Sequence, residues 1–173
     1  ALHAWAPERG EADRILAGLE VWAWDDAQDG YRLAGARSET WDTSFALQAL
    51  AGASDALGPE TARPARDAGA RWLATQQLRS PLPDAERFLR EDVVGGFCFS
   101  GRWHAWPVSD CTAEAVEALL ATPAGDPGGG GTLAAGDDAL AEAAAFILRA
   151  QNDDGGFGSY ERRRGPWRLE WMN

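Results

Sequence analysis

The sequence predicts an all-α protein of stacked helix pairs, because one short unit of sequence occurs twice. Residues 70–76 and 145–151 are similar, and each copy ends in glutamine. A Gly-Gly-Phe turn follows both copies, at 95–97 and 155–157, with 15 additional residues in the first copy. One such helix pair cannot bury its apolar face alone, so the pairs stack, either as an open solenoid or as a closed, double-layered (α/α) barrel.

Apolar residues at helical spacing, separated by Gly- and Pro-containing stretches, predict five helices. We expect them over most of 1–25 and over about 43–53, 65–77, 110–121 and 139–151. In the second helix, the spacing of Phe45, Leu47 and Leu50 turns these side chains toward a core.

The connections between these helices are recognised by composition. Residues 25–37 are polar and contain glycine, and GPETARP at 58–64 breaks the chain before the third helix. SPLPDAERFLRED at 80–92 has the character of an inserted loop. The Gly-rich run at 122–138 predicts a flexible surface loop.

Charge and composition exclude several classes of function. The net charge of −11 argues against a nucleic-acid partner, because no basic patch is available to meet phosphates. Cys98 and Cys111 are too few for a disulfide framework and predict reduced thiols. His3 and His104 lack metal-ligand spacing and no phosphate-binding loop occurs, so we expect no metal and no cofactor. The 173 residues contain no signal peptide and no apolar run of membrane-spanning length.

The stretch from Gly95 to Leu120 indicates the chemistry, because its first half places one carboxylate among many aromatic rings. Two Phe, two Trp, one His and two Cys lie close to Asp110 in sequence. An ionised carboxylate is costly to bury, so an acid in such surroundings tends to keep its proton. Asp110 is therefore a candidate Brønsted acid in an apolar site with aromatic walls. Alternatively it caps the helix that follows, and the two roles can coexist. Trp41 and Asp110 also align, and in a closed barrel they would hold equivalent places at one rim.

These motifs resemble a known family. A helix-end glutamine before a Gly-Gly-aromatic turn is similar to the QW repeat of triterpene cyclases. VSDCTAE at 108–114, ETWDTSFALQAL at 39–50, GGFCFS at 95–100 and QNDDGGFGSYE at 151–161 resemble stretches of oxidosqualene cyclases, the lanosterol and cycloartenol synthases, in the same order. The resemblance implies that residues 1–173 are an incomplete central portion of one (α/α)-barrel domain, from a bacterial-type oxidosqualene cyclase.

The same resemblance implies a catalytic acid and two residues that assist its proton transfer. Asp110 aligns with the acid that protonates the epoxide, Cys111 with a cysteine that hydrogen-bonds this acid, and Glu114 with a glutamate that returns a proton to it through water. The related squalene–hopene cyclases carry a DxDD motif, which is absent here, and this favours an epoxide over plain squalene. Residue type alone leaves other roles open, since Cys111 also suits a small core position and Glu114 an exposed helix surface.

Aromatic residues are the second implied part of the site. Trp41, Phe99 and Tyr160 align with residues that line the cyclase cavity. An aromatic face stabilises a cation without reacting with it, by ~0.5–2 kcal/mol for each ring. Core packing is the alternative role for Trp41 and Phe99. A further group is assigned to packing between repeats: Trp72, Phe97 and Phe157.

Two positions are associated with product choice, and they disagree. Val108 resembles the lanosterol type, whereas His104 resembles the cycloartenol type. The product therefore stays open between lanosterol, cycloartenol and others.

The resemblance implies an isomerase that converts 2,3-oxidosqualene, a small lipid, to a sterol precursor such as lanosterol. It also implies that the complete enzyme is monotopic on the cytoplasmic face of a membrane through elements outside these residues, and that this chain alone is inactive. Two alternatives remain: a triterpene or diterpene cyclase acting on a different polyene, and a helical-repeat binding module without catalysis. A carboxyl hydrogen-bonded to a thiol inside a closed cavity would favour the enzyme.

Overall fold

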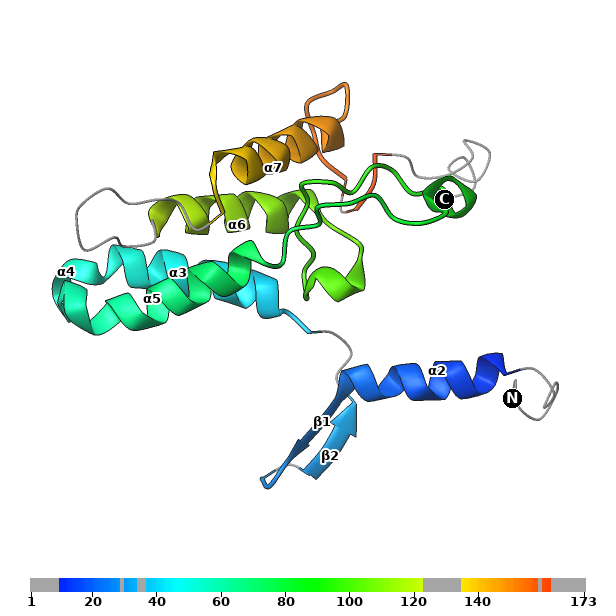
Figure 1. Ribbon diagram of the computed structural model, residues 1–173, viewed down its shortest axis with the longest axis horizontal. Coiled ribbons are helices and arrows are strands. Elements are labelled where there is room, and N and C mark those ends of the chain that lie inside the picture. The colour runs from blue at the N-terminus through cyan, green and yellow to red at the C-terminus, as the bar shows by residue number, and fades with distance from the viewer. Residues whose placement is uncertain (1–9, 29, 34–36, 123–134, 159, 163–173) are drawn as a thin grey trace. The chain divides into compact units, whose positions relative to one another are not determined.

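The computed structural model describes residues 10–28, 30–33, 37–122, 135–158 and 160–162. The chain divides into two compact units, Ala1–Arg37 and Ser38–Asn173, which are described separately (Figure 1). Within the described ranges, no helix is long and apolar enough to cross a membrane.

The first unit contains a helix followed by a β-hairpin. The strands pair antiparallel, with Ala23 opposite Leu33 and Asp26 opposite Gly30. Gly30 has a φ of +70°, a conformation that favours a residue without Cβ at the end of a tight turn. In chain order the elements are α2 (Glu11–Leu19), the 3-10 turn η1 (Glu20–Trp22), β1 (Ala23–Asp26) and β2 (Gly30–Leu33).

The hairpin shows that the expected helix does not reach residue 25, and that the polar connection expected over 25–37 contains a β-strand. One side chain that follows β2, Arg37, stabilises β1. The Arg37 guanidinium donates a hydrogen bond to the Ala23 carbonyl at 3.0 Å and lies 5.0 Å from the centre of the Trp24 ring. These partners lie far along the chain, so local helical periodicity could not reveal them. Residues 1–9 of the expected helix lie outside the described part.

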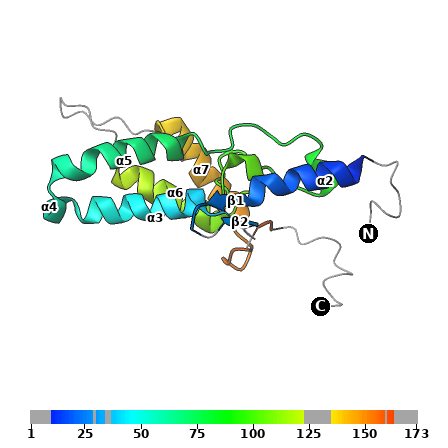
Figure 2. The same cartoon turned by 90° about the horizontal axis from the view of Figure 1, so that it is seen from below.

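The second unit is helical, as predicted, with α6 at its centre. Helix α6 packs against α3, α5 and α7 (Figure 1), and α3 and α5 lie side by side (Figure 2). In chain order the elements are α3 (Glu39–Gly52), α4 (Ser54–Leu57), α5 (Pro59–Ala74), η2 (Ala85–Phe88), η3 (Arg102–His104), α6 (Ser109–Ala121) and α7 (Asp137–Ala150).

Three details of the helix prediction were wrong. Helix α5 begins at Pro59, which fits the first position of a helix because its missing N–H has no partner there. The helix then continues through Pro64 and loses one backbone hydrogen bond. On α3, Leu47 is buried as expected, but Phe45 is 41% exposed. Helix α7 begins at Asp137, inside the loop expected over 122–138, of which 123–134 lie outside the described residues.

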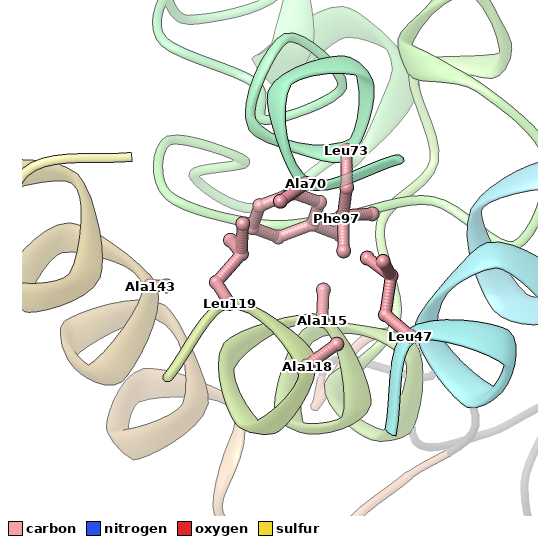
Figure 3. Packing of buried hydrophobic residues seen from close by; sticks show 8 residues of the cluster. All are labelled: Leu47, Ala70, Leu73, Phe97, Ala115, Ala118, Leu119 and Ala143. Atoms are coloured by element: carbon pink, nitrogen blue, oxygen red, sulfur yellow. The ribbon is translucent and has the colours of Figure 1, made fainter. Parts of the chain in front are cut away.

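The hydrophobic core of this unit contains side chains from all four long helices, together with one aromatic side chain, Phe97. Phe97, which comes from the Gly-Gly-Phe turn, is 1% exposed and was correctly assigned to packing between repeats. Alanines on α6 alternate with larger side chains from its neighbours, so the helices approach closely. Figure 3 shows the cluster: Leu47, Ala70, Leu73, Phe97, Ala115, Ala118, Leu119 and Ala143.

The hydrogen bonds show the same repeat. They align Gln151 with Gln77, one residue after the glutamine that the sequence alignment predicted. Gln77 donates from Nε2 to the Gly95 carbonyl at 3.0 Å, and Gln151 donates to the Gly155 carbonyl at 2.9 Å. Gln76, the predicted counterpart of Gln151, accepts the Arg102 N–H instead. Sequence similarity over seven residues could not separate two adjacent glutamines, whereas the contact to the turn does.

The next bond in each copy repeats the same register. The Leu78 N–H donates to the Gly96 carbonyl at 3.0 Å, and the Asn152 N–H donates to the Gly156 carbonyl at 2.8 Å. In the first copy Gln77 also reaches the Ala139 carbonyl in the first turn of α7, at 2.7 Å. The turn of one repeat is thereby tied to the helix of the next.

The first Gly-Gly turn leaves no room for side chains. Gly95 has a φ of +92°, and a Cβ there would lie 2.1 Å from the Glu142 carbonyl oxygen on α7. A Cβ at Gly96 would lie 2.5 Å from Cβ of Pro107. The glycines therefore permit close packing of this turn against α7 and against the segment that enters α6.

We expect Gly95→Ala to lower the free energy of unfolding by about 3 kcal/mol or more, because it adds backbone strain to a clash with a main-chain carbonyl. Urea unfolding followed by circular dichroism measures this. Gly52→Ala is the control, since it lies in the last turn of α3 with nothing within 4 Å of its Cβ. That control should be neutral or stabilising by about 0.5–1 kcal/mol. Equal stability of Gly95→Ala and wild type would contradict the packing described.

Candidate active site

Asp110 lies in the first turn of α6, as the sequence predicted. It is the second residue of this helix, after the N-cap Val108 and Ser109. Its Oδ1 accepts the backbone N–H of Cys111 at 2.7 Å, so the carboxylate satisfies one of the free amides at the helix start. Asp110 therefore binds a free amide at the start of the helix, as the alternative interpretation expected. It is not the N-cap residue, which is Val108, and no side-chain hydrogen bond caps the helix at that position.

The side chain of Asp110 is exposed in this chain. It lines an open pocket whose other residues are Ser109, Ala113, Ile147 and Phe157. Phe157, which was assigned to packing between repeats, is 48% exposed here. The carboxylate therefore faces a largely apolar surface on one side. The enclosed, aromatic-walled site expected around Asp110 stays a prediction.

Both cysteine thiols are buried beside this acid. Cys111 is 1% exposed, and Cys98 is fully buried. Burial is the main cause of the raised pKa of Cys111, and the negative charge and hydrogen bond of Asp110 raise it further. Burial also raises the pKa of Cys98 to about 11, opposed by hydrogen bonds from the backbone of Trp106 and Ala105. Both thiols therefore keep their protons, and Cys111 can donate one to Asp110.

The extended segment after the Gly-Gly turn positions two helix starts. The Val108 N–H donates to the Phe97 carbonyl at 3.1 Å, and the Trp41 N–H donates to the Phe99 carbonyl at 3.3 Å. The Phe97 N–H in turn donates to Oγ1 of Thr112 in the first turn of α6, at 2.9 Å. The first turns of α3 and α6, which carry Trp41 and Asp110, are therefore held by one strand-like segment.

The predicted cavity aromatics fall into two groups. Trp41 contacts Phe99, with ring centres 5.9 Å apart, and also meets Phe45 edge to face at 4.8 Å. Tyr160 instead contacts Trp106, with ring centres 5.0 Å apart. Trp41 and Phe99 thus lie together and Tyr160 lies with Trp106, whereas the role of all three in lining a cavity stays a prediction.

The second aromatic group is fixed by an ion pair that the sequence analysis did not identify. Nε of Arg90 lies 2.5 Å from Oε1 of Glu161, and both side chains are mostly buried. The Arg90 guanidinium also lies 4.5 Å from the centre of the Trp106 ring and donates to the Ala105 carbonyl. This ion pair ties the 80–92 loop to the segment that follows α7.

The two product-choice positions flank this group. Val108 is 5% exposed and ends the segment that enters α6. His104 is half-buried, and its Nδ1 has no hydrogen-bond partner among the described residues. Burial lowers the pKa of His104, and the positive charge of Arg90 lowers it further, so this imidazole is held neutral.

Glu114 is one helical turn after Asp110 and is held from α3. Nε2 of Gln48 lies 2.7 Å from Oε2 of Glu114 and 3.2 Å from its main-chain oxygen. Sequence patterns did not single out Gln48, although it shares a helix face with Trp41 and Phe45, which precede it by seven and three residues. That spacing is the signal that could have identified it.

No group of three or more His, Cys, Asp or Glu residues in the described ranges is arranged to hold a metal ion. The polar groups gathered around the start of α6 are thus a carboxylic acid, a thiol and a second carboxyl on the next turn. This set can donate and recover a proton, and the nearby rings offer polarisable faces to a positive charge.

Comparison with known proteins matches most of the second unit to one family. The family model of the squalene–hopene cyclase C-terminal domain matches residues 37–168. Human lanosterol synthase is 38% identical over 146 residues, which cover 84% of this chain and 20% of that protein. Cycloartenol synthase of Dictyostelium discoideum is 33% identical over 149 residues, covering 84% of this chain and 20% of that protein.

A fungal relative shows the same partial coverage. Terpene cyclase/mutase atnI of Arthrinium sp is 35% identical over 134 residues, which cover 78% of this chain and 19% of that protein. The chain thus spans about a fifth of the length of these relatives. The helix pairs, the repeated Gln-to-glycine bond and the family match agree with one another, and the prediction of an (α/α) barrel is confirmed. The chain belongs to the family of the squalene–hopene cyclase C-terminal domain, as a segment similar to part of the lanosterol and cycloartenol synthases.

Proposed function

We propose that the enzyme containing this chain is an oxidosqualene cyclase, an isomerase that converts 2,3-oxidosqualene to a polycyclic sterol precursor such as lanosterol. The observation that carries the proposal is the Asp110–Cys111 pair at the start of α6: the carboxyl accepts the backbone N–H of Cys111, and the buried, protonated Cys111 thiol belongs to the next residue.

The acid starts the reaction by giving its proton to the epoxide oxygen. The C–O bond then breaks, the oxygen becomes a hydroxyl, and the positive charge left on carbon is attacked by the nearest double bond. Negative charge develops on Asp110 in this step, the backbone N–H of Cys111 stabilises it, and we assign the Cys111 thiol to the same role. A strained epoxide is basic enough for one acid assisted in this way, so no further carboxylates are needed beside it.

The later steps need surfaces that stabilise a cation without reacting with it. Trp41 and Phe99 supply two adjacent rings at the start of α3, and Tyr160 with Trp106 supplies two more. We assign these rings to cation stabilisation. The proton finally lost from carbon balances the proton given by Asp110, so the product is an isomer of the substrate, and Glu114 returns a proton to Asp110 through water.

Because Asp110 is exposed here and the match covers only about a fifth of each relative, we propose that other parts of the complete enzyme close the cavity around it. The substrate is a lipid, and we propose that the complete enzyme takes it up monotopically at the cytoplasmic face of a membrane. His104 and Val108 would then face the folded substrate and bias the product.

Asp110→Asn in the complete enzyme should lower turnover by about a thousandfold, because an amide of nearly the same shape cannot supply the proton. Product formed from 2,3-oxidosqualene is measured by mass spectrometry, and circular dichroism checks the fold. The matched control is Asp138→Asn, since Asp138 is also the second residue of its helix, α7, and is also exposed. Substantial turnover by Asp110→Asn would mean that Asp110 serves the helix end alone.

Stability at high pH tests whether the buried thiols stay protonated. The pKa of Cys98 rises from 9.0 to about 11 on folding, so the unfolded chain releases this proton at a lower pH than the folded chain. The resulting stabilisation is complete below about pH 9 and is lost as the pH rises to about 11, by about 2 kcal/mol in total.

Urea unfolding of wild type and Cys98→Ser at pH 8 and pH 10.5 measures this difference. The wild type should lose more stability between the two pH values than the serine variant does. A native protein whose thiols react rapidly with a thiol reagent at pH 8 would contradict the assignment.

Trp41→Phe and Trp41→Leu separate cation stabilisation from packing. Phenylalanine keeps a weaker aromatic face, so the rate should fall only a few-fold, at ~1.4 kcal/mol for each factor of ten. Leucine removes the aromatic face, and incompletely cyclised alcohols should accumulate. The product spectra of the two variants are compared at equal folded concentration. Identical spectra, with loss of stability alone, would show that Trp41 serves only to pack against Phe45 and Phe99.

A further inference from the structure

Gln48 connects the two helices that carry the candidate site. Its amide nitrogen lies 2.7 Å from Oε2 of Glu114 and 3.2 Å from the main-chain oxygen of the same residue. Gln48 comes from α3 and Glu114 from α6, and both side chains are half-buried. The bond to the main-chain oxygen holds the Gln48 amide against α6, and the bond to Oε2 holds the Glu114 side chain.

The chemistry of the two partners determines which way the amide faces. Both atoms of Glu114 that Gln48 contacts are acceptors, and an amide NH₂ group carries two donor hydrogens. The nitrogen therefore faces Glu114 and both of its hydrogens are used. An amide does not titrate, so it can hold Oε2 whether Glu114 carries a proton or has lost it.

The contact lies two turns after Trp41 on α3 and one turn after the acid on α6. Gln48 follows Trp41 by seven residues and Phe45 by three, so the three share one face of α3. Glu114 follows Asp110 by four residues on α6, so these two carboxyls share one face as well. A bond between Gln48 and Glu114 therefore joins the face that carries Trp41 to the face that carries the acid.

We propose that Gln48 is a positioning residue for reprotonation of Asp110. With Oε2 occupied by the amide, Oε1 of Glu114 is the oxygen left to carry and transfer the proton. After each cycle the Asp110 carboxylate takes a proton from a water molecule, which is replenished from Oε1 of Glu114, and Glu114 recovers its proton from solvent. This inference rests on the proposed function, since it requires that Asp110 lose one proton in every turnover.

The proposal predicts different effects on the first and the later turnovers, which a purely structural bond would not produce. The first turnover uses the proton already on Asp110, and only later turnovers need a new one. Loss of the Gln48 amide should therefore leave the first turnover unchanged and slow the following ones. A bond that merely joins α3 to α6 would instead change stability, or slow all turnovers alike.

The test is Gln48→Met in the complete enzyme, which keeps the length of the side chain and removes both donors. With 2,3-oxidosqualene in excess, we expect a burst of one product per active site at the wild-type rate, within about twofold. The steady rate that follows should fall about tenfold, the usual effect of losing a hydrogen bond to a charged group. The solvent deuterium isotope effect on this steady rate should rise, and KM should fall in proportion to the steady rate, because kcat/KM reports only the steps up to cyclisation.

Gln151→Met is the matched control, because it also removes an amide-to-carbonyl bond that holds a turn. It should lower the melting temperature without producing a burst. Gln48→Asn is a second variant that keeps an amide too short to reach Glu114, so the test survives if the methionine variant folds poorly.

Three other outcomes would each contradict the proposed function or the role of Gln48. A wild-type enzyme that makes no cyclic product would overturn the proposed function and the role of Gln48 with it. A wild type that cyclises, with Gln48 variants that show the wild-type steady rate and isotope effect, would overturn the role of Gln48 alone. Equal slowing of the first and later turnovers would assign Gln48 to structure.

Discussion

The packing of the Gly95–Ser100 segment between four helices is the constraint on which the rest of this unit depends. Its two glycines have no space for a Cβ, its carbonyls accept the amides at the starts of α3 and α6, and Phe97 fills the core. The free N–H groups of a helix start need acceptors, and here one extended segment supplies them to two helices. The positions of Trp41 and Asp110 follow from this sharing, because each lies in the first turn of a helix so anchored.

The same arrangement explains how one residue can serve Asp110 twice. Cys111 follows Asp110 in the first turn, so its N–H is free to meet the carboxylate while its side chain is buried. Burial keeps the thiol protonated, and a protonated thiol can donate. A serine would offer a stronger donor, but it would be a polar group in a nearly closed apolar position. Cysteine reconciles burial with donation, because it is itself among the residues most often buried.

Sequence patterns predicted the parts of the fold that depend on local periodicity and failed where distant partners decide. The four long helices of the second unit and the burial of Leu47 followed from spacing, and Phe97 was assigned to packing between repeats. The β1–β2 hairpin did not, because Arg37 stabilises it from outside the strands. Among site residues, Asp110 and Cys111 stood out by composition, and Trp41 by alignment. Gln48, Arg90 and Glu161 did not, because their importance comes from pairing across helices and loops that are far apart in sequence.

The repeated unit also explains why an acid and an aromatic wall occur at matching places. Each of the two copies has a glutamine that binds its Gly-Gly turn, and the first turn leads toward the start of α6. Because that start is set by backbone bonds, the side chain there is free to differ between copies: tryptophan on α3 and aspartate on α6. Gln48 then adds a side-chain bond between the same two helices, one or two turns beyond their starts. The scaffold is thus specified by main-chain contacts, and the chemistry by the few side chains that the scaffold leaves unconstrained.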